Sequence, residues 1–359
     1  MLHPFYFRFS VKALEAVDLT LAIAVTMSRM EPTDNYKNLS PDEILNVIDK
    51  IGYRSDGRIL ALNSYENRVY QIGIEDEKPI IAKFYRPGRW TDAAIQEEHD
   101  FTRFLAGEDI PVIAPITDKD DRTLFHLDGF RFALYARVGG RPPELDNPDH
   151  LLQLGRTLAR IHNFGELEPF QHRPELTIKS FGIEPSEYVL AHNFVPADLL
   201  EAYSTLVSDL LKRIEQCFAR AGKVKHLRLH GDCHHGNILW NNDAPFIVDF
   251  DDARMGPAVQ DLWMLLSGDR EYMTARLFDL LDGYCELREF DPRELYLIEA
   301  LRTLRMIHYA GWIASRWDDP AFPMAFPWFN SQRYWEDHIL SLREQAAMMD
   351  EPPLEWESE

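Results

Sequence analysis

Cysteine is scarce in this chain of 359 residues. The three cysteines, Cys217, Cys233 and Cys285, are an odd number without paired spacing, which argues against a disulfide framework. The pattern favours a reducing compartment, so we expect a cytoplasmic protein. Positive charge is also in deficit, because the formal net charge is -21. That balance disfavours a protein that binds nucleic acid or an anionic membrane by neutralising phosphates.

Long apolar runs are missing as well. The most apolar N-terminal stretch, Val17 to Met27, is too short to span a bilayer and contains Asp18. The segment that follows it, SRMEPTDNYKNLSPDEI, is rich in residues that favour turns. We therefore expect residues 1–29 to be a poorly anchored extension, and we hypothesise that the native chain starts at Met27 or Met30.

Residues 30–138 show the patterns of a sheet with few helices. Two helices are predicted, over 40–53 and from Thr91 to Gly107, and each starts at a Ser or Thr that can cap it. Alternating apolar residues around a polar turn indicate strands over 58–87. An Asp-Gly pair between two apolar runs over 123–138 is the strongest short hairpin signal available.

Residues 139–350 are expected to be mainly helical, since apolar residues recur at helical spacing, for example over 197–222. Two short extended pieces, HLRLH and PFIVDF, interrupt the helices. The last residues, 351–359, look like a solvated acidic tail. The expected fold class is therefore α+β in two lobes, an antiparallel sheet lobe with one main helix followed by a larger helical lobe.

The segment LRLHGDCHHGNILW, residues 227–240, gathers many reactive side chains. Zinc binding must be weighed first, because His230, Cys233, His234 and His235 carry suitable ligand atoms. However, four ligands within six residues lack the separation of a close pair from a distant pair that lets a loop close around the ion. The spacing thus argues against a zinc cage.

Phosphoryl transfer fits the same segment better. It needs a carboxylate to accept the proton of the acceptor hydroxyl, and oxygen ligands to hold magnesium against the phosphates. His230, Asp232 and Asn237 reproduce the spacing of the protein-kinase motif H-R-D-x-x-x-x-N. Asp249-Phe250-Asp251 then follows an extended run, which supplies a second carboxylate at the end of a strand.

A lysine on a strand and a glutamate on the next helix should complete such a site. Lys83 ends the strand IIAK, and the helix that starts near Thr91 offers Glu97 and Glu98. Glu98 shares a face with apolar residues and is preferred, while Glu97 lies to one side. Each residue alone is a weak signal, but their order along the chain is a strong one.

The segments HGDCHHGN and IVDFDDA resemble the two signatures of the aminoglycoside phosphotransferase and choline kinase superfamily, which has a two-lobed, protein-kinase-like fold. The resemblance runs from about Ile44 to Leu354. More narrowly, the chain is similar to bacterial serine/threonine protein kinases of stress response within that superfamily. The segments that carry this similarity are LNSYENRVYQ, KFYRPGRW, LRLHGDCHHGNILW, DDARMGPAVQDLWMLL and DPAFPMAFPWF.

The resemblance implies a role for each matching position. Asp232 is implied to be the proton acceptor, and Asp249 takes part in catalysis as a metal ligand. Residues 30–138 are implied to bind ATP and residues 139–350 to carry the catalytic groups and bind the acceptor. The remaining implied roles are magnesium binding by Asn237 and Asp249, and ATP binding by Ser64, Lys83 and Glu98.

Two departures from the protein-kinase pattern stand out. The loop LNSYENRVY contains no G-x-G-x-x-G, so side chains such as those of Ser64 and Glu66 must help to form its turn, and how tightly it closes over the phosphates is open. Asp251 replaces the glycine of D-F-G, which removes the usual hinge and adds a carboxylate near the expected magnesium.

The function expected is that of an ATP- and Mg²⁺-dependent kinase, monomeric, that phosphorylates serine or threonine in a protein substrate during bacterial stress response. Nucleic-acid and membrane partners are not expected. Two alternatives stay open: a kinase of small hydroxyl compounds of the aminoglycoside, choline or homoserine type, and a catalytically silent nucleotide-binding module. The presence of Lys83, Asp232, Asn237 and Asp249 speaks against the silent module.

Overall fold

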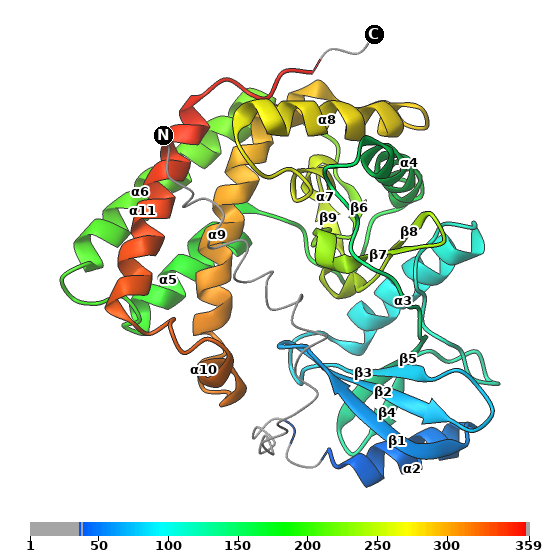
Figure 1. Ribbon diagram of the computed structural model, residues 1–359. Helices are drawn as coiled ribbons and strands as arrows, with labels where there is room; N and C mark the ends of the chain where they lie inside the picture. The colour runs from blue at the N-terminus through cyan, green and yellow to red at the C-terminus, as the bar shows by residue number, and fades with distance from the viewer. Residues whose placement is uncertain (1–35, 37–38, 357–359) are drawn as a thin grey trace.

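A computed structural model describes residue 36 and residues 39–356, so the extension expected over 1–29 lies outside the described residues. Figure 1 shows a lobe built on a β-sheet below a larger lobe of helices. The predicted two-lobed α+β fold is confirmed. Within the described residues, no helix is long and apolar enough to cross a membrane.

The N-terminal lobe is one antiparallel sheet with the strand order β1-β2-β3-β5-β4. Apolar residues of α2 pack with one set of sheet side chains, and those of α3 pack with another. The elements are β1 (Ser55–Leu62), β2 (Arg68–Ile74), β3 (Ile80–Phe84), β4 (Phe125–Leu127), β5 (Phe130–Ala136), α2 (Pro41–Ile51) and α3 (Asp92–Gly107).

Local sequence explains these boundaries. Ser40 caps α2 through a reciprocal pair of hydrogen bonds with Glu43, as a capping box does. Asp128 and Gly129 both have positive φ, 46° and 87°, which is what a two-residue hairpin turn between β4 and β5 requires. The predicted helices and the predicted hairpin are confirmed.

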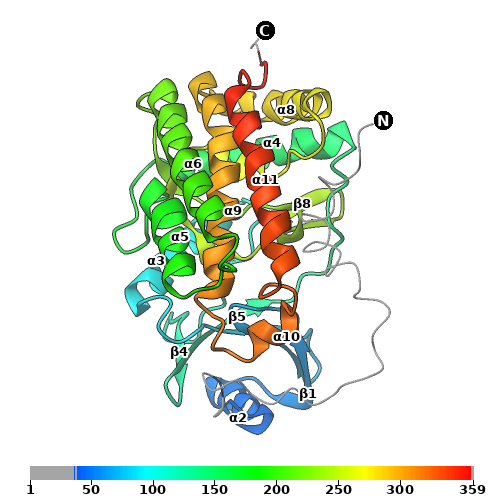
Figure 2. The same cartoon turned by 90° about the vertical axis from the view of Figure 1, so that its left-hand side faces the viewer.

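The C-terminal lobe is built around one large apolar core, to which α3 of the N-terminal lobe contributes Phe101 and Leu105. In Figure 2 the long helices α6, α9 and α11 run side by side. The end of α10 contacts the loop between β1 and β2, where the ring of Phe326 packs on that of Tyr65. The helices are α4 (Pro148–Gly165), α5 (Glu184–Ala191), α6 (Leu200–Ala221), α7 (Val259–Trp263), α8 (Arg270–Cys285), α9 (Ile298–Ala314), α10 (Ala321–Ala325) and α11 (Gln332–Asp350), with short turns η3 (Lys179–Ile183), η4 (His235–Asn237), η5 (Phe250–Asp252) and η6 (Pro292–Leu297).

Two small antiparallel strand pairs in the C-terminal lobe flank the acids of the sequence motif. β6 pairs with β9, and β7 forms a tight hairpin with β8. Their bounds are β6 (Leu227–Leu229), β7 (Ile238–Asn241), β8 (Ala244–Ile247) and β9 (Arg254–Gly256). The sequence indicated β6 and β8 but neither of their partners, β7 and β9.

Candidate active site

The segment that contains Asp232, residues 230–237, is a loop held by its own histidine. The buried ring of His230 lies with Nε2 2.8 Å from the carbonyl oxygen of Val248, and its Nδ1 accepts the backbone N–H of Asp232 at 3.2 Å. Nε2 therefore carries the proton and donates it to that carbonyl. This fixes the loop against the strand end that leads to Asp249.

Asp261 anchors the same loop from below. Its side chain is fully buried in α7, where Oδ2 accepts the backbone N–H of His230 and Oδ1 that of Gly231, both at 2.8 Å. Burial alone would raise the pKa of Asp261, but the hydrogen bond and charge of His162 outweigh it and lower the pKa. Sequence reasoning missed Asp261, although a lone acid within AVQDLWMLL was a usable signal.

The carboxylate of Asp232 is 23% exposed and has one cation in direct contact. Arg305 of α9 donates Nη1–H to Oδ1 of Asp232. The other oxygen, Oδ2, has His234 Nε2 at 3.5 Å, which is too long for a strong hydrogen bond. One oxygen is thus held while the other is left to accept a proton. No pattern in the sequence pointed to Arg305, which lies 73 residues away.

Asn237 and Asp249 lie at the two open ends of the β7–β8 hairpin, where the Asn237 carbonyl accepts the N–H of Val248 at 3.0 Å. The Asn237 amide donates to the Asp232 carbonyl at 3.0 Å, so its side-chain oxygen is directed elsewhere. Asp249 has a left-handed backbone, φ 62°, and its carboxylate is 51% exposed. One amide oxygen and one carboxylate are the hard ligands that Mg²⁺ prefers, so these residues fit the ion.

Lys83 reaches the same place from the other lobe. Its Nζ lies 2.6 Å from Oδ1 of Asp249 and 3.5 Å from Oδ1 of Asp251, and the lysine side chain is only 8% exposed. Burial alone would lower the pKa of the amine, but the two carboxylates outweigh it and raise the pKa. Lys83 and Asp249, 166 residues apart in the chain, therefore meet across the lobes.

Glu98 is buried close to this pair, but its ion-pair partner is Arg173, at 3.1 Å. Its charge contributes to the raised pKa of Lys83, after those of Asp249 and Asp251. Burial raises the pKa of Glu98 itself, and the charges of Lys83 and Arg173 oppose that rise. Glu97 has a different place, since its carboxylate accepts the backbone N–H groups of His172 and Arg173, each at 2.8 Å.

Ser64 lies in the loop between β1 and β2, where its Oγ accepts the N–H of Asn67 at 3.4 Å. Asn67 in turn donates to Oδ2 of Asp251 at 3.1 Å. Asp251 also accepts from Arg89, so its Oδ2 is occupied by contacts to the N-terminal lobe. The acid at the glycine position of D-F-G thus ties the two lobes through Oδ2, while its Oδ1 lies 3.5 Å from Nζ of Lys83.

His230 and His234 of the motif make hydrogen bonds within or next to their own loop, and Cys233 is a buried free thiol. Within residues 36 and 39–356, no cluster of three or more His, Cys, Asp or Glu side chains has the arrangement of a metal site. Both ring nitrogens of His230 are engaged, as described above. Cys233 is fully buried, and burial, with the carboxylates of Asp261 and Asp232, raises the pKa of its thiol.

Comparison with known proteins adds a family to this geometry. The family described as "Phosphotransferase enzyme family" matches residues 58–298. The chain is 43% identical over 320 residues to stress response kinase A of Escherichia coli strain K12, covering 89% of this chain and 96% of that protein. It is 40% identical, with the same coverage, to a Salmonella typhimurium strain LT2 protein named "Serine/threonine protein kinase RdoA".

Among solved structures, the fold is similar to that of amicoumacin kinase hAmiN in complex with AMP-PNP, Ca²⁺ and Ami. The TM-score is 0.67 at 18% identity, and the match covers 87% of this chain and 95% of that one. At this identity the likeness speaks for the fold alone.

Proposed function

The chain belongs to the phosphotransferase enzyme family, and from that premise we propose that it transfers the γ-phosphoryl group of ATP to a serine or threonine hydroxyl of a protein substrate. The observation that carries the proposal is the meeting of Lys83 and Asp249 across the lobes, beside the loop of Asp232. Phosphoryl transfer needs these groups in one place, because positioning and charge stabilisation supply most of the catalysis.

In this proposal Asp232 accepts the proton of the acceptor hydroxyl through Oδ2, the oxygen that Arg305 does not hold. Lys83 binds the phosphates of ATP, for which its raised pKa keeps the amine charged. Ser64 contacts the nucleotide from the β1–β2 loop. Glu98 keeps negative charge near Lys83 and supports its position indirectly, since its own ion pair is with Arg173.

Asn237 and Asp249 would hold Mg²⁺. When bound, the ion neutralises charge on the phosphate oxygens during transfer. The β7–β8 hairpin supports this arrangement, because it pairs the backbone of Asn237 with that of Val248, the residue before Asp249.

The choice of a protein acceptor rests on the two curated relatives, whose names describe a stress response kinase and a serine/threonine protein kinase. The high coverage of both proteins supports the transfer of that activity to this chain. On the same ground we propose a role in bacterial stress response. The cysteine pattern supports a cytoplasmic location, and we propose that the chain acts as a monomer.

The experiment is to incubate the purified protein with ATP labelled at the γ-phosphate and Mg²⁺. Autophosphorylation and transfer to generic protein substrates are scored against a panel of amino alcohols, aminoglycosides, choline and homoserine. Asp232→Asn is the inactive control. Asp243→Asn, in the exposed turn of the β7–β8 hairpin, is the matched control that should keep activity.

Label on protein with the wild type and with Asp243→Asn, but not with Asp232→Asn, is the expected result. If only a small alcohol is labelled, the proposed protein acceptor is wrong and the acceptor is a small molecule. No label on any acceptor would reject the phosphotransferase assignment and favour a silent nucleotide-binding module.

A further inference from the structure

The loop between β1 and β2, residues 63–67, contains no glycine, yet it is held down firmly from the other lobe. Glu66 reaches from this loop to the end of α9. Its Oε2 accepts the indole N–H of Trp312 at 2.6 Å and lies 2.8 Å from Nε of Arg316. The Glu66 side chain is only 12% exposed, so these contacts are largely shielded from solvent.

Arg86 makes a second tie between the same loops. Its Nε and Nη2 donate to the carbonyl oxygens of Glu66 and Tyr65, at 3.1 and 3.2 Å. Nη2 also donates to Oδ2 of Asp319, at 2.9 Å, and that carboxylate is 2% exposed. One guanidinium therefore joins the β1–β2 loop to the segment between α9 and α10.

Ring contacts extend the same connection. The Tyr65 ring lies 5.0 Å from the Phe326 ring, centroid to centroid, and the Phe326 ring also packs against Trp312. We call Glu66, Arg86, Trp312, Arg316 and Asp319 the clasp. Its members come from three segments of the sequence, LNSYENRVYQ, KFYRPGRW and the stretch from Trp312 to DPAFPMAFPWF.

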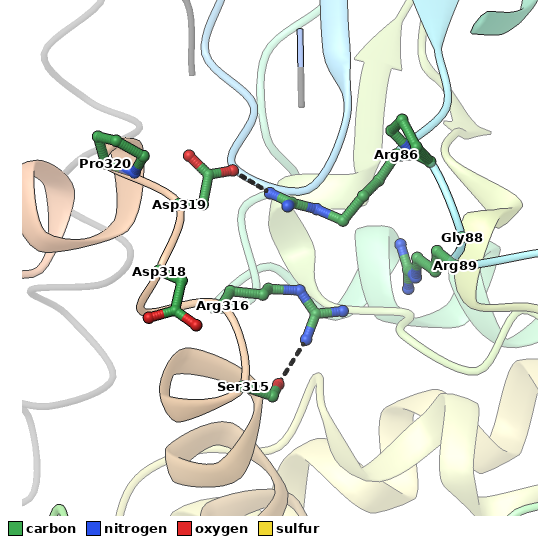
Figure 3. Close-up of a pocket in the computed structure, with 9 residues that line it drawn as sticks. Arg86, Gly88, Arg89, Ser315, Arg316, Asp318, Asp319 and Pro320 are labelled. Carbon is green, nitrogen blue, oxygen red and sulfur yellow. Dashed lines mark hydrogen bonds and ion pairs between the residues drawn. The ribbon is translucent and has the colours of Figure 1, made fainter. Parts of the chain in front are cut away.

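The clasp borders a cavity of about 490 Å³ between the lobes (Figure 3). Arg86 and Arg89 line it from the β3–α3 loop, and Arg316 and Asp319 line it from the other side. Arg89 connects this cavity with the proposed catalytic groups, because its guanidinium forms ion pairs with both Asp251 and Asp252. The clasp thus lies one side chain away from the acids next to Asp249.

Stability alone is a poor explanation for the clasp. A buried ion pair often contributes little net stability, because desolvation of both charges offsets their attraction. Glu66 Oε1 is also buried without a directed hydrogen bond, although Nε of Arg86 lies 2.9 Å away, since that N–H is directed at the backbone carbonyl. The charge of this oxygen is therefore matched by the nearby guanidinium groups of Arg86 and Arg89 and not by a directed hydrogen bond.

We propose that Glu66 is a positioning residue for the nucleotide. By binding Trp312 and Arg316, it holds the β1–β2 loop closed over the nucleotide site. Glycine-rich loops reach such a position through backbone contacts instead. This rests on the proposed function, since it presumes that ATP binds under that loop. Binding to a loop that is already ordered costs less conformational entropy than binding to a free one. The clasp should therefore act on nucleotide affinity more than on the chemical step.

The test compares Glu66→Gln and Trp312→Phe with the wild type. Glu66→Gln removes the charge that Arg316 pairs with, and Trp312→Phe removes the N–H donor while keeping an aromatic ring. The dissociation constant of AMP-PNP is measured by calorimetry in the presence of Mg²⁺. KM for ATP and kcat are measured from initial rates of phosphotransfer. Melting temperatures report the folded state of each variant.

We expect Glu66→Gln to weaken AMP-PNP binding about tenfold and to raise KM for ATP by a similar factor, with kcat at saturating ATP within about threefold of the wild type. Trp312→Phe should weaken binding less. The double variant should lose less than the product of the two single losses, because both changes break the same contact. Glu75→Gln, at an exposed ion pair of the same lobe, is the matched control and should bind as the wild type does.

Unchanged nucleotide affinity in both variants, with a lower melting temperature, would reduce the clasp to a structural contact and overturn the proposal. Tighter binding in Glu66→Gln would also overturn it, because the clasp would then obstruct the nucleotide. If Glu66→Gln fails to fold, Trp312→Phe decides by the same criteria. If the wild type does not bind AMP-PNP, the proposed function is rejected together with the role of Glu66. If the wild type, Glu66→Gln and Trp312→Phe bind AMP-PNP equally well, only the role of Glu66 is rejected.

Discussion

The loop of Asp232 and the clasp hold the two sides of the site in different ways. The loop is fixed within one lobe by hydrogen bonds in which each partner is satisfied, chiefly from Asp261 and His230 to backbone groups. The clasp joins two lobes through side-chain charges, and it leaves a buried oxygen of Glu66 without a directed donor. The first arrangement suits the rigid base that we propose at Asp232, and the second suits a loop that we propose is held in place over a nucleotide.

If this contrast holds, changes near Asp232 should alter turnover with little effect on nucleotide affinity. The largest effect is expected for Asp232→Asn, which keeps the shape of the side chain but removes the proton acceptor. We expect kcat to fall about 10²- to 10⁴-fold, while the dissociation constant of AMP-PNP stays within about twofold. Initial rates with labelled ATP and calorimetry measure the two quantities. An equal loss in both would erase the contrast.

Asp261→Asn tests the anchor beneath the loop. An amide can accept from only one of the two backbone N–H groups, so its NH₂ group would face a buried donor. We expect the free energy of unfolding to fall by about 2–4 kcal/mol and kcat to fall at least tenfold. Urea unfolding and initial rates measure these changes. Asp291→Asn, at the partly exposed cap of η6, is the control, and a comparable loss there would discount the special place of Asp261.

The pH dependence of stability offers a gentler perturbation of the same anchor. Glu294 accepts the N–H of Val259 in α7, and burial raises its pKa to about 7. Because the folded protein holds this proton more tightly than the unfolded chain does, stability should fall as pH rises from about 4.5 to 7, by roughly 3 kcal/mol in total. Glu294→Gln should flatten that slope in urea unfolding curves. A slope that survives the substitution must come from other groups.

Arg305→Gln is expected to have the smallest effect. Losing the guanidinium frees the Asp232 carboxylate to rotate, and we expect kcat to fall about tenfold, or about 1.4 kcal/mol, with an unchanged KM for ATP. Arg302→Gln, one turn earlier on α9 and paired with Glu299, is the matched control. A higher kcat in Arg305→Gln would mean that the pair restrains the base instead of orienting it.

The sequence predicted well what is local. Caps, turn residues and short spacings act over a few residues, so the helices at Ser40 and Thr91, the Asp-Gly hairpin and the motif around Asp232 could be identified in advance. The roles given to Asp232, Asn237, Asp249, Lys83, Ser64 and Glu98 stay predictions, although the structure brings Lys83 and Asp249 together.

What escaped prediction depends on contacts between distant segments. Arg305 lies 73 residues from its partner, and Trp312 lies 246 residues from Glu66. No local pattern marks such pairs. The residues that flank an arginine or tryptophan in the sequence of a helix show the same spacing of apolar residues whether or not that side chain faces another lobe. Arg173 is an example. It forms the ion pair with Glu98 that we expected from the sequence for Lys83.

Gly231 has φ 83°, and a Cβ on it would lie 2.3 Å from the carbonyl oxygen of Asp252. The turn that precedes Asp232 therefore touches the turn that follows Asp249 with no room for a side chain between them. A change in the angle between the lobes would alter how far either acid lies from the amine at position 83, but it would leave the separation of the two acids untouched. That separation is set once, during folding, and does not depend on how the lobes are placed.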